Sequence, residues 1–425
     1  MGLATLADRH RRASTNGPLS SDTIRLVDRP RSALIPAGGY SDGRHDGEKG
    51  LRVIVTLPWG ERLGGAEAML QSILDGVAQT PHEFELVFFQ DGPWAAELAR
   101  AGFRVEVIPS GRFREAHRWL LTVARLAKLL RKRRPDVVLN WSAKTQLYGS
   151  PAAVLSGMPK RVVWWQQGIP EPDFWLDRLA TRLPAAAVGC YSHAAARAQA
   201  QLPPGRPTVV IPAGAGEPPS EEPPAAIDLP ANVPVVGVVG RLQPWKGQDR
   251  VLRAQALLRD RGHRLHLVIV GGDAYGLSSD YAASLEPLAR ELGLAQDVTM
   301  TGQVPDAGPF IERMDVMVNA SDPEPFGIVL LEAMARGVAV LAVDSGGPAE
   351  FIRDGVSGCL ARSGEPADLA DALERLLDDA TLRSRVAAAG RESYRREFTE
   401  RALRERFFAA LQCTRSPRES GSSAG

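Results

Sequence analysis

Two glutamates separated by seven residues, Glu324 and Glu332, are the strongest candidates for chemistry in this sequence. Pro325 and Gly327 follow the first glutamate and suit the start of a helix, which Gly337 would end. The start of a helix presents free N–H groups and a partial positive charge, and both suit a phosphate group. One carboxylate beside that phosphate can hold the hydroxyls of a sugar, and the other can hold those of a ribose. A helix with two solvated glutamates is the alternative interpretation.

A second motif places two cations, Arg241 and Lys246, on one loop between Gly240 and Gly247. The loop follows a strand predicted over residues 233–239. Arginine can contact two phosphate oxygens at once and lysine supplies a point charge, so this pair suits a diphosphate. A solvated loop is the alternative.

A third motif lies near the start of the folded chain, where Gly64 and Gly65 separate a predicted strand over residues 51–57 from a helix. A strand, a glycine turn and a helix can bring the backbone close to a phosphate. The GxGxxG pattern of a nicotinamide dinucleotide site is absent, which counts against a dehydrogenase. A plain strand–helix turn remains the alternative here.

Strands and helices alternate along the chain, which predicts an α/β fold of parallel sheets with helices on both faces. Strands are predicted at residues 51–57, 84–89, 103–108, 136–141, 161–165, 187–191, 208–211, 233–239, 265–270, 298–301, 315–318 and 338–343. Ligands of such sheets lie at the carboxyl ends of the strands. By position, Trp141, Gln167 and His193 are therefore candidate cleft residues. His193 also begins a predicted helix, where a structural role is the simpler interpretation.

Composition limits the classes of protein that the chain can belong to. A length of 425 residues suits two domains, and a net charge of +1 argues against binding to nucleic acid. The three cysteines are far apart, without metal-ligand spacing, which indicates a reduced, cytoplasmic protein. Neither a signal peptide nor an apolar run long enough to span a membrane is visible.

Composition also divides the chain into segments. Residues 1–48 lack periodicity and predict a disordered extension, and a region rich in proline predicts a linker. The predicted segments are a disordered extension (1–48), a first Rossmann-like domain (49–212), a linker (213–231), a second Rossmann-like domain (232–395), a last helix (396–412) and a flexible tail (413–425).

One segment, residues 111–134, holds nine Lys and Arg residues against a single acid, Glu115. Apolar residues recur in it at helical spacing, so the segment predicts a basic amphipathic helix. Such a helix can lie on an anionic membrane surface. The other interpretation, slightly favoured, is a domain helix whose apolar face packs on the sheet. Localisation is therefore expected to be cytoplasmic, with peripheral contact at the membrane as the second interpretation.

The two glutamates and their surroundings resemble those of retaining, nucleotide-sugar-dependent glycosyltransferases of the GT-B fold. The resemblance rests on Pro-Phe-Gly after Glu324, on Ala-Met-Ala after Glu332, and on the runs at residues 338–340, 346–350 and 354–358. It extends from about residue 51 to about residue 411 and is strongest in the second half. It implies two Rossmann-like domains facing each other across a cleft, with the last helix packing back on the first domain.

The resemblance also implies roles for individual residues. Catalytic roles fall to Glu324, Arg241 and Lys246, the two cations neutralising the departing nucleoside diphosphate. Donor-binding roles fall to Gly64, Gly65, Gly302, Val304, Phe326, Gly327, Ile328 and Glu332. No cofactor or metal is expected, because the Asp-x-Asp motif is absent and protein cations take its place. The acceptor would be a hydroxyl of a polysaccharide, a lipid-linked glycan or a small natural product, in a role such as cell-envelope polysaccharide synthesis.

This sequence departs from the family pattern on the acceptor side. Relatives often carry a histidine at the end of the fourth or fifth strand, where this chain has Asn140-Trp141-Ser142 and Gln166-Gln167-Gly168. Trp141, Gln167 and His193 are thus the acceptor-side candidates that remain. The missing histidine supports one rival hypothesis, a catalytically silent scaffold or regulatory protein that binds sugar nucleotides.

Overall fold

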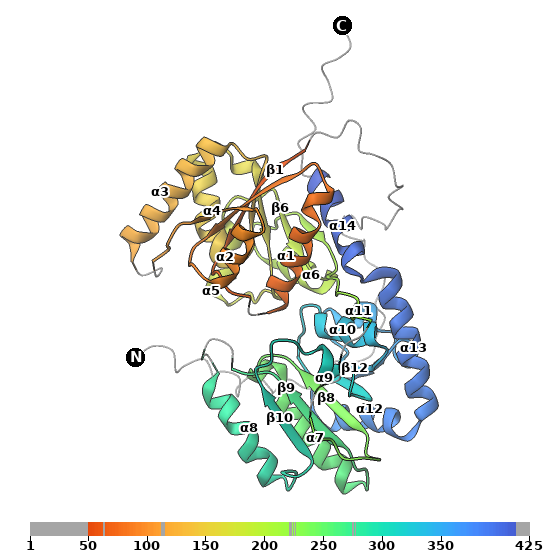
Figure 1. Cartoon of the computed structure of the whole chain (residues 1–425). Helices are drawn as coiled ribbons and strands as arrows, with labels where there is room; N and C mark the ends of the chain where they lie inside the picture. The colour runs from red at the N-terminus through yellow and green to blue at the C-terminus, as the bar shows by residue number, and fades with distance from the viewer. Residues whose placement is uncertain are drawn as a thin grey trace, which may run out of the picture. The chain divides into compact units, whose positions relative to one another are not determined.

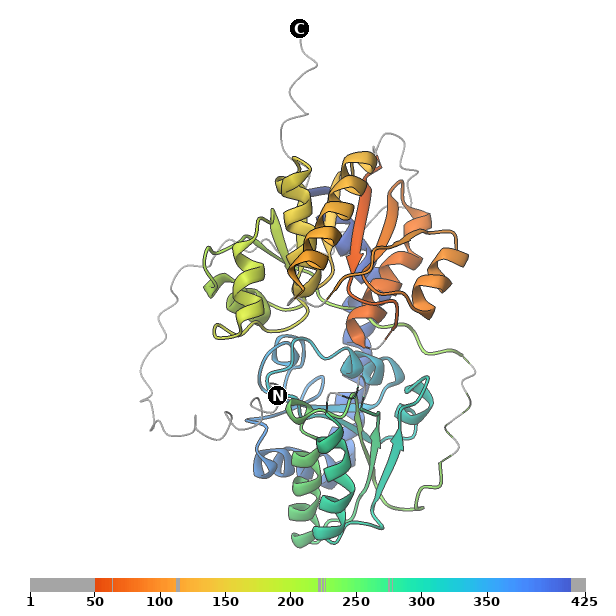
Figure 2. The same ribbon diagram turned by 90° about the vertical axis from the view of Figure 1, so that its left-hand side faces the viewer.

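The computed structural model describes residues 50–413 except 63, 112–114, 221, 222, 224, 226, 274, 275 and 277. The predicted extension over residues 1–48 and nearly all of the predicted tail lie outside the described residues. Two parallel sheets form the described chain, each with helices on both faces (Figures 1 and 2). This is the GT-B fold that the resemblance implies.

The strands of the two sheets follow the same order, apart from one additional edge strand, β7, in the first sheet. This order gives each sheet a doubly wound topology. The first sheet runs in the order β3 (Arg104–Val107), β2 (Glu83–Phe88), β1 (Arg52–Leu57), β4 (Val137–Asn140), β5 (Val162–Trp165), β6 (Ala187–Cys190) and β7 (Thr208–Val210). The second runs in the order β10 (Val298–Gly302), β9 (His266–Val270), β8 (Val235–Val239), β11 (Val316–Asn319), β12 (Ala339–Val343) and β13 (Cys359–Ala361). In each sheet the order reverses beside the first strand, and the crevice at such a point is a ligand site in folds of this kind.

Alternation along the strands explains the layers. In β1, Val53 and Val55 belong to a core cluster with α1 and α2, whereas Ile54 belongs to a cluster with α3 and α4. Because the strands are buried on both faces, they appear in the sequence as continuous apolar runs. In the second domain, Val236 and Val238 of β8 pack with α7, α8 and α12.

The helices have the following bounds. The first domain contains α1 (Gly65–Asp75), α2 (Pro93–Arg100), α3 (Ala116–Arg133), α4 (Ala143–Leu155), α5 (Trp175–Arg182), α6 (His193–Gln201) and the short 3₁₀ helices η2 (Val77–Gln79) and η3 (Pro159–Arg161). The second contains η4 (Pro244–Lys246), α7 (Gln248–Asp260), α8 (Ser279–Glu291), α9 (Gly308–Ile311), α10 (Ile328–Arg336), α11 (Pro348–Phe351), α12 (Pro366–Asp378) and α13 (Ala380–Glu397), and α14 (Glu400–Cys413) follows. Among the described residues, no helix is both long enough and apolar enough to span a bilayer.

Three expectations about elements differ from the structure. The three-residue strand β13 is missing from the predictions, because its run is too short to show a period. The helix α10 begins at Ile328 rather than at Pro325, since Gly327 before it has a φ of 92°, outside the helical region. The last helix begins at Glu400 rather than at residue 396, because a break at Phe398 and Thr399 separates α13 from α14.

That break is where the chain returns from the second domain to the first. Ala215 donates its N–H to the Phe398 carbonyl at 3.0 Å and accepts the Glu400 N–H at 3.1 Å. The Tyr394 hydroxyl donates to the same Ala215 carbonyl at 3.0 Å. Beyond the break, Arg404 of α14 donates to the carbonyl of Ser72 in α1 at 2.6 Å. The last helix therefore packs on the first domain.

The basic helix α3 uses its apolar stripe for packing. Val123, Leu126, Ala127 and Leu130 are all buried in the cluster that α3 forms with α4 and the sheet. This packing agrees with the interpretation of α3 as a domain helix.

Replacing Phe407 of α14 with alanine should lower the free energy of unfolding by about 3–5 kcal/mol, because it removes a buried aromatic ring and leaves a cavity. Phe407 is 3% exposed, and its ring lies 6.0 Å from that of Trp165 and 5.7 Å from that of Phe408. Urea denaturation measures the effect, with L257A, at an exposed leucine of α7, as the control. A loss below 1 kcal/mol would contradict the packing of α14 on the first sheet.

Candidate active site

A cavity of about 350 Å³ lies where loops from both domains meet. Its first-domain wall consists of Trp59, Gly64, Gly65, Ala66, Glu67, Gln167 and Tyr191. Its second-domain wall consists of Arg241, Trp245, Lys246 and residues 324–329. Most of these residues follow the carboxyl end of a strand, as ligand sites of parallel sheets do. The volume is in the range of small-molecule sites.

The second-domain wall is organised by an ion pair between Lys246 and Glu324. The lysine Nζ lies 2.7 Å from Oε2 of the glutamate, and the side chains are 17% and 8% exposed. Asn319 donates a further hydrogen bond to the same oxygen at 3.3 Å, and the ammonium lies 4.1 Å from the ring centre of Trp245. Burial opposes ionisation, but the charge and hydrogen bond of Lys246 outweigh it and lower the pKa of Glu324. Glu324 is therefore a carboxylate in the neutral pH range.

Two glycines hold the backbone of Glu324 in place. Gly347 donates its N–H to the Glu324 carbonyl at 2.8 Å, and a Cβ at Gly347 would lie 2.4 Å from Cα of Phe326. Gly346 has a φ of 65°, and a Cβ there would lie 2.1 Å from the same carbonyl oxygen. Only glycine fits so close to another backbone, which explains the Gly-Gly pair in the motif at residues 346–350.

Two helix N-termini without side-chain caps border the cavity. The N-cap residue of α10 is Gly327 and that of α1 is Gly64, and neither position has a side chain that could accept the first N–H groups. The two ends approach closely, since a Cβ at Gly65 would lie 2.9 Å from Cδ1 of Ile328. The cavity is therefore bordered by N–H groups that suit an anion.

Arg241 lines the same cavity and contributes a cation. Its guanidinium forms no hydrogen bond or ion pair with any other residue in the described part of the chain. Its carbonyl accepts a hydrogen bond from Gln248 at 2.9 Å, which fixes the loop instead. Among the described residues of the cavity, Lys246 is thus in an ion pair with a carboxylate, whereas Arg241 makes no ion pair and interacts with Glu67 only at longer range.

The acceptor-side candidates lie at different depths. Gln167 lines the cavity and donates from Nε2 to the carbonyl of Trp141. Trp141 itself does not line the cavity: its ring is fully buried and stacked on Trp165, and its indole N–H donates to the Ala66 carbonyl at 3.1 Å. The expectation that the Trp141 side chain shapes an acceptor pocket is therefore corrected, because the ring packs into the core instead.

His193 also lies outside the cavity wall. It begins α6, and its backbone N–H donates to Glu350 of α11 at 2.8 Å. Ala194 donates to the other oxygen of the same carboxylate at 2.6 Å. The N-terminus of α6 is thus occupied by a carboxylate of the second domain, as the helix dipole favours.

Three of the donor-side candidates, Gly302, Val304 and Glu332, also do not line the cavity. Gly302 ends β10, where its carbonyl accepts the Gly271 N–H at 3.1 Å. Val304 packs partly buried against the core. Glu332 lies in α10, just over one turn from its start, and burial raises its pKa to about 7 from the usual 4.5.

Three aromatic wall residues, Trp59, Tyr191 and Trp245, were not among the candidates from the sequence, and neither was Glu67. Tyr191 directly follows β6, Trp59 is the second residue after β1, and Trp245 stands beside Lys246. Position at a strand end was therefore the available signal. The same signal selects His193, which lies two residues beyond Tyr191, the side chain that reaches the cavity.

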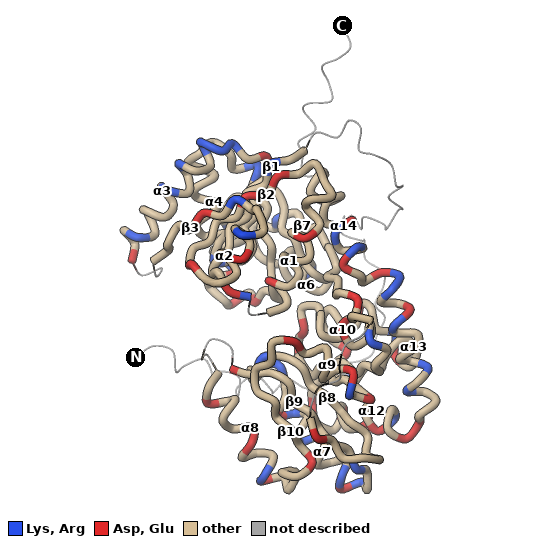
Figure 3. The backbone as a smooth tube through the Cα atoms, in the orientation of Figure 1, with Lys and Arg blue, Asp and Glu red and all other residues tan. Residues whose placement is uncertain are grey.

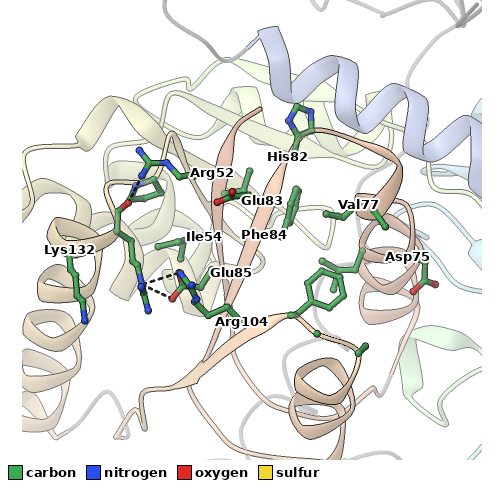
Figure 4. A pocket seen from close by; sticks show the side chains of 18 residues that line it. Arg52, Ile54, Asp75, Val77, His82, Glu83, Phe84, Glu85, Arg104 and Lys132 are labelled. Atoms are coloured by element: carbon green, nitrogen blue, oxygen red, sulfur yellow. Dashed lines mark hydrogen bonds and ion pairs between the residues drawn. The ribbon is translucent and has the colours of Figure 1, made fainter. Parts of the chain in front are cut away.

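A larger cavity, of about 1080 Å³, lies at the opposite ends of strands β1 to β3 (Figure 4). Its charged groups are engaged with one another: Glu85 accepts Arg133 at 3.2 Å and lies 3.7 Å from Arg104. Arg52 donates to the carbonyls of Arg133 and Arg134 at the end of α3. These contacts hold the end of α3 against the sheet. The charged residues named here therefore have a structural role.

Within the described part of the chain, one cluster has metal-ligand geometry, His263 with Glu374 and Asp378. It is not part of the cavity wall, and Arg261 already pairs with Glu374 at 2.7 Å. The positive charge of Arg261 disfavours a bound metal ion at this cluster. We therefore interpret the cluster as a surface ion-pair network.

Comparison with known proteins gives two family matches. Residues 63–216 match the model of Glycosyltransferase Family 4, and residues 220–393 match the model of Glycosyl transferases group 1. Together the matches span both halves of the cavity wall apart from Trp59.

Curated relatives cover part of the chain. A D-inositol 3-phosphate glycosyltransferase of Nocardia farcinica is 39% identical over 194 residues, which are 44% of this chain and 43% of the relative. A lipopolysaccharide core biosynthesis glycosyltransferase of Rhizobium meliloti, LpsE, is 33% identical over 187 residues, 44% of this chain and 52% of the relative. The chain thus spans about half the length of these relatives.

Solved structures are similar over most of the chain. The crystal structure of Anabaena Alr3699/HepE in complex with UDP and glucose has a TM-score of 0.73 at 25% identity and covers 85% of this chain and all of that protein. A sucrose-phosphate synthase of Thermosynechococcus elongatus, with a TM-score of 0.70 at 18% identity, shows the same fold and covers 85% of this chain and 98% of its own.

The raised pKa of Glu332 predicts a pH-dependent effect of E332Q. The folded protein favours the protonated side chain, so the stability that Glu332 contributes is present below pH 4.5 and is lost as pH rises to about 7. E332Q, which stays neutral, should therefore stabilise the ligand-free protein at pH 8 and have little effect at pH 4.5. The shift from 4.5 sets an upper limit of about 3 kcal/mol.

Thermal unfolding at both pH values measures this effect, with E291Q, at an exposed glutamate of α8, as the control. An equal change at both pH values for E332Q would contradict the raised pKa.

Proposed function

Because the chain belongs in both of its halves to the glycosyltransferases that these two models describe, we propose that it transfers a sugar from a nucleoside-diphosphate sugar to an acceptor hydroxyl. One observation carries the proposal. The unpaired guanidinium of Arg241 shares a cavity with the N-terminus of α10 and with the Lys246–Glu324 pair. Free cations and N–H groups suit a diphosphate, and a buried carboxylate suits sugar hydroxyls. The Anabaena protein binds UDP and glucose on the same fold.

In this proposal Arg241, Lys246 and the N-terminus of α10 bind the diphosphate and stabilise the charge that develops as it leaves. Glu324 orients the transferred sugar. Lys246 is already held beside Glu324 in the ligand-free protein, so the cation is positioned before the donor arrives. Gly64 and Gly65 border the diphosphate from the first domain, with Phe326, Gly327 and Ile328 opposite. Gly302 and Val304 lie along the direction of the nucleobase, and Glu332 holds the ribose.

The proposed transfer retains the anomeric configuration. The acceptor oxygen attacks the anomeric carbon from the face that the diphosphate leaves, and the departing phosphate takes the acceptor proton. Cations of the protein neutralise the leaving group, so no metal ion takes part. The acceptor is a polysaccharide, a lipid-linked glycan or a small natural product, in keeping with relatives that act on an inositol phosphate or on the lipopolysaccharide core.

R241A should weaken donor binding by about tenfold to a hundredfold, because it removes a charge-assisted hydrogen bond to phosphate. Calorimetry with UDP-glucose, UDP-galactose, UDP-N-acetylglucosamine and GDP-mannose, with and without EDTA, measures the loss. R253A, at an exposed arginine of α7, is the control. Unchanged affinity in R241A, or donor binding that needs a divalent ion, would contradict this donor site.

The catalytic arm uses the same donors. E324Q should lose most turnover while it still binds donor, and the wild-type product should have the configuration of the donor by NMR. Donor binding without turnover on any acceptor or on water would instead support the silent scaffold.

A membrane role for α3 is a separate proposal about the location of the enzyme. Lys and Arg gather along α3 (Figure 3), and Leu120 and Leu121 on its outer side are 59% and 53% exposed. The apolar stripe is buried, so only these leucines and the cations remain for a membrane. We propose that this outer side makes peripheral contact with anionic lipid.

R125Q/K128Q/K132Q should release the protein from vesicles of phosphatidylglycerol at 0.1 M salt, because each neutralised cation near the surface removes about 1 kcal/mol. Co-sedimentation with the vesicles measures the fraction of protein that stays bound. R253Q/R290Q/R395Q, which neutralises three exposed cations of α7, α8 and α13, is the control. Equal loss in both variants, or no binding by the wild type, would rule out the contact.

A further inference from the structure

The two walls of the cavity differ in chemistry. Among the described residues that line it, both cations, Arg241 and Lys246, come from the second domain. The first-domain wall offers a carboxyl group, a phenol and an amide, from Glu67, Tyr191 and Gln167. If the second-domain wall holds the donor diphosphate, the first-domain wall faces the position from which an acceptor approaches.

The Tyr191 side chain is 4% exposed, and its hydroxyl makes no hydrogen bond of normal geometry with a described group. The indole N–H of Trp165, which also lacks such a bond, lies near the hydroxyl and interacts with it. Buried hydroxyls are normally satisfied, so an orphan that lines a ligand cavity indicates a missing partner. The ring itself is fixed by edge contact with Trp165, 5.6 Å between centroids.

Glu67 is the carboxyl group of the first-domain wall. It lies in the first turn of α1, two residues after Gly65, and is 5% exposed. Arg241 across the cavity and Tyr191 beside it are both close enough to interact with Glu67 electrostatically. Burial raises the pKa of Glu67, although hydrogen bonds from Trp59 and from the backbone favour its charged form.

We propose that Glu67 and Tyr191 form the acceptor subsite of this cavity, which rests on the donor site proposed above. Glu67 accepts a hydrogen bond from the attacking hydroxyl and orients its lone pair. Tyr191 donates to a second oxygen of the acceptor. Because Glu67 lies near Arg241, which binds the departing diphosphate, it is on the face from which a retaining attack must come.

In the transfer, a bond forms between the acceptor oxygen and the anomeric carbon, and the bond from that carbon to the diphosphate oxygen breaks. The bonding electrons leave with the diphosphate, which also receives the acceptor proton. Glu67 remains a hydrogen-bond acceptor throughout and forms no covalent bond. This subsite suits a neutral polyol or sugar hydroxyl, since the described first-domain wall contains no cation.

The first test separates a ligand-binding hydroxyl from a structural one. Y191F should lower the melting temperature by less than Y148F does, because the Tyr191 hydroxyl makes no hydrogen bond of normal geometry with a described group. Y148F is the matched control: Tyr148 is also buried, but its hydroxyl donates to the Gly111 carbonyl at 3.2 Å, so Y148F should lower the melting temperature. A loss of stability in Y191F equal to that in Y148F would overturn the role of Tyr191.

The second test needs no identified acceptor. Water and azide serve as acceptors for whichever donor of the panel binds most tightly. E67A should lower donor hydrolysis about a hundredfold, as misplacement of a reactant does, while UDP affinity stays within threefold of the wild type. Azide should restore turnover by occupying the vacated space and give a glycosyl azide of retained configuration. E97A, at an exposed glutamate of α2, is the control.

The outcomes decide between the alternatives. Hydrolysis by E67A within threefold of the wild type, including the case in which both stay at background, overturns the subsite. An azide product of inverted configuration also overturns it, because it would show Glu67 to be a nucleophile on the opposite face. If the wild type does not bind UDP, the donor site is refuted instead. The melting temperatures of Y191F and Y148F would still test the subsite.

Discussion

The ion pair of Lys246 and Glu324 is the interaction on which the second-domain wall depends. A carboxylate that is 8% exposed is costly unless it is paired, and Lys246 and Asn319 supply the partners. The pair joins two loops that are 78 residues apart, one after β8 and one after β11. Gly346 and Gly347 pack against the backbone of the Glu324 loop, because a residue with a Cβ at either position would clash with that backbone. The start of α10 is set by the same loop.

The position of the first-domain wall depends on a different constraint. At residues 398–400 the chain returns from the second domain to the first. A bridge between Ala215 and Thr399 joins the linker to the break between α13 and α14. Phe326, Phe351 and Phe398 pack around it, with ring centres 5.2 to 6.2 Å apart. Phe326 follows Glu324 by two residues, so the return of the chain is packed directly against the site loop. Glu350 on the N-terminus of α6 adds a polar contact between the domains.

Much of the fold and part of the site follow from the sequence alone. Parallel strands buried on both faces are continuous apolar runs, so every strand except β13 was visible, and their alternation with helices indicated two doubly wound sheets. Glu324, Arg241, Lys246, Gly64 and Gly65 were identified because their motifs combine glycines with charged residues at strand ends. The carboxyl ends of parallel strands meet at one edge of a sheet, so the sequence predicts a common site for Arg241, Lys246 and Glu324 of the second domain. The resemblance, and not the strand pattern, implied that Gly64 and Gly65 of the first domain face them.

Tertiary structure decided which side chains near a strand end reach the cavity. Adjacent residues of a strand point in opposite directions, and the chain leaves this pattern beyond the last strand residue, so sequence position alone does not separate a core residue from a wall residue. Trp141 turned inward to stack on Trp165, whereas Tyr191, two residues before His193, lines the cavity. The basic helix α3 was open to two interpretations until α4 was seen to cover its apolar stripe. Pairing was equally hidden: the sequence gives Arg241 and Lys246 the same charge, but only packing places a carboxylate at 2.7 Å from Lys246 and, within the described residues, none in an ion pair with Arg241.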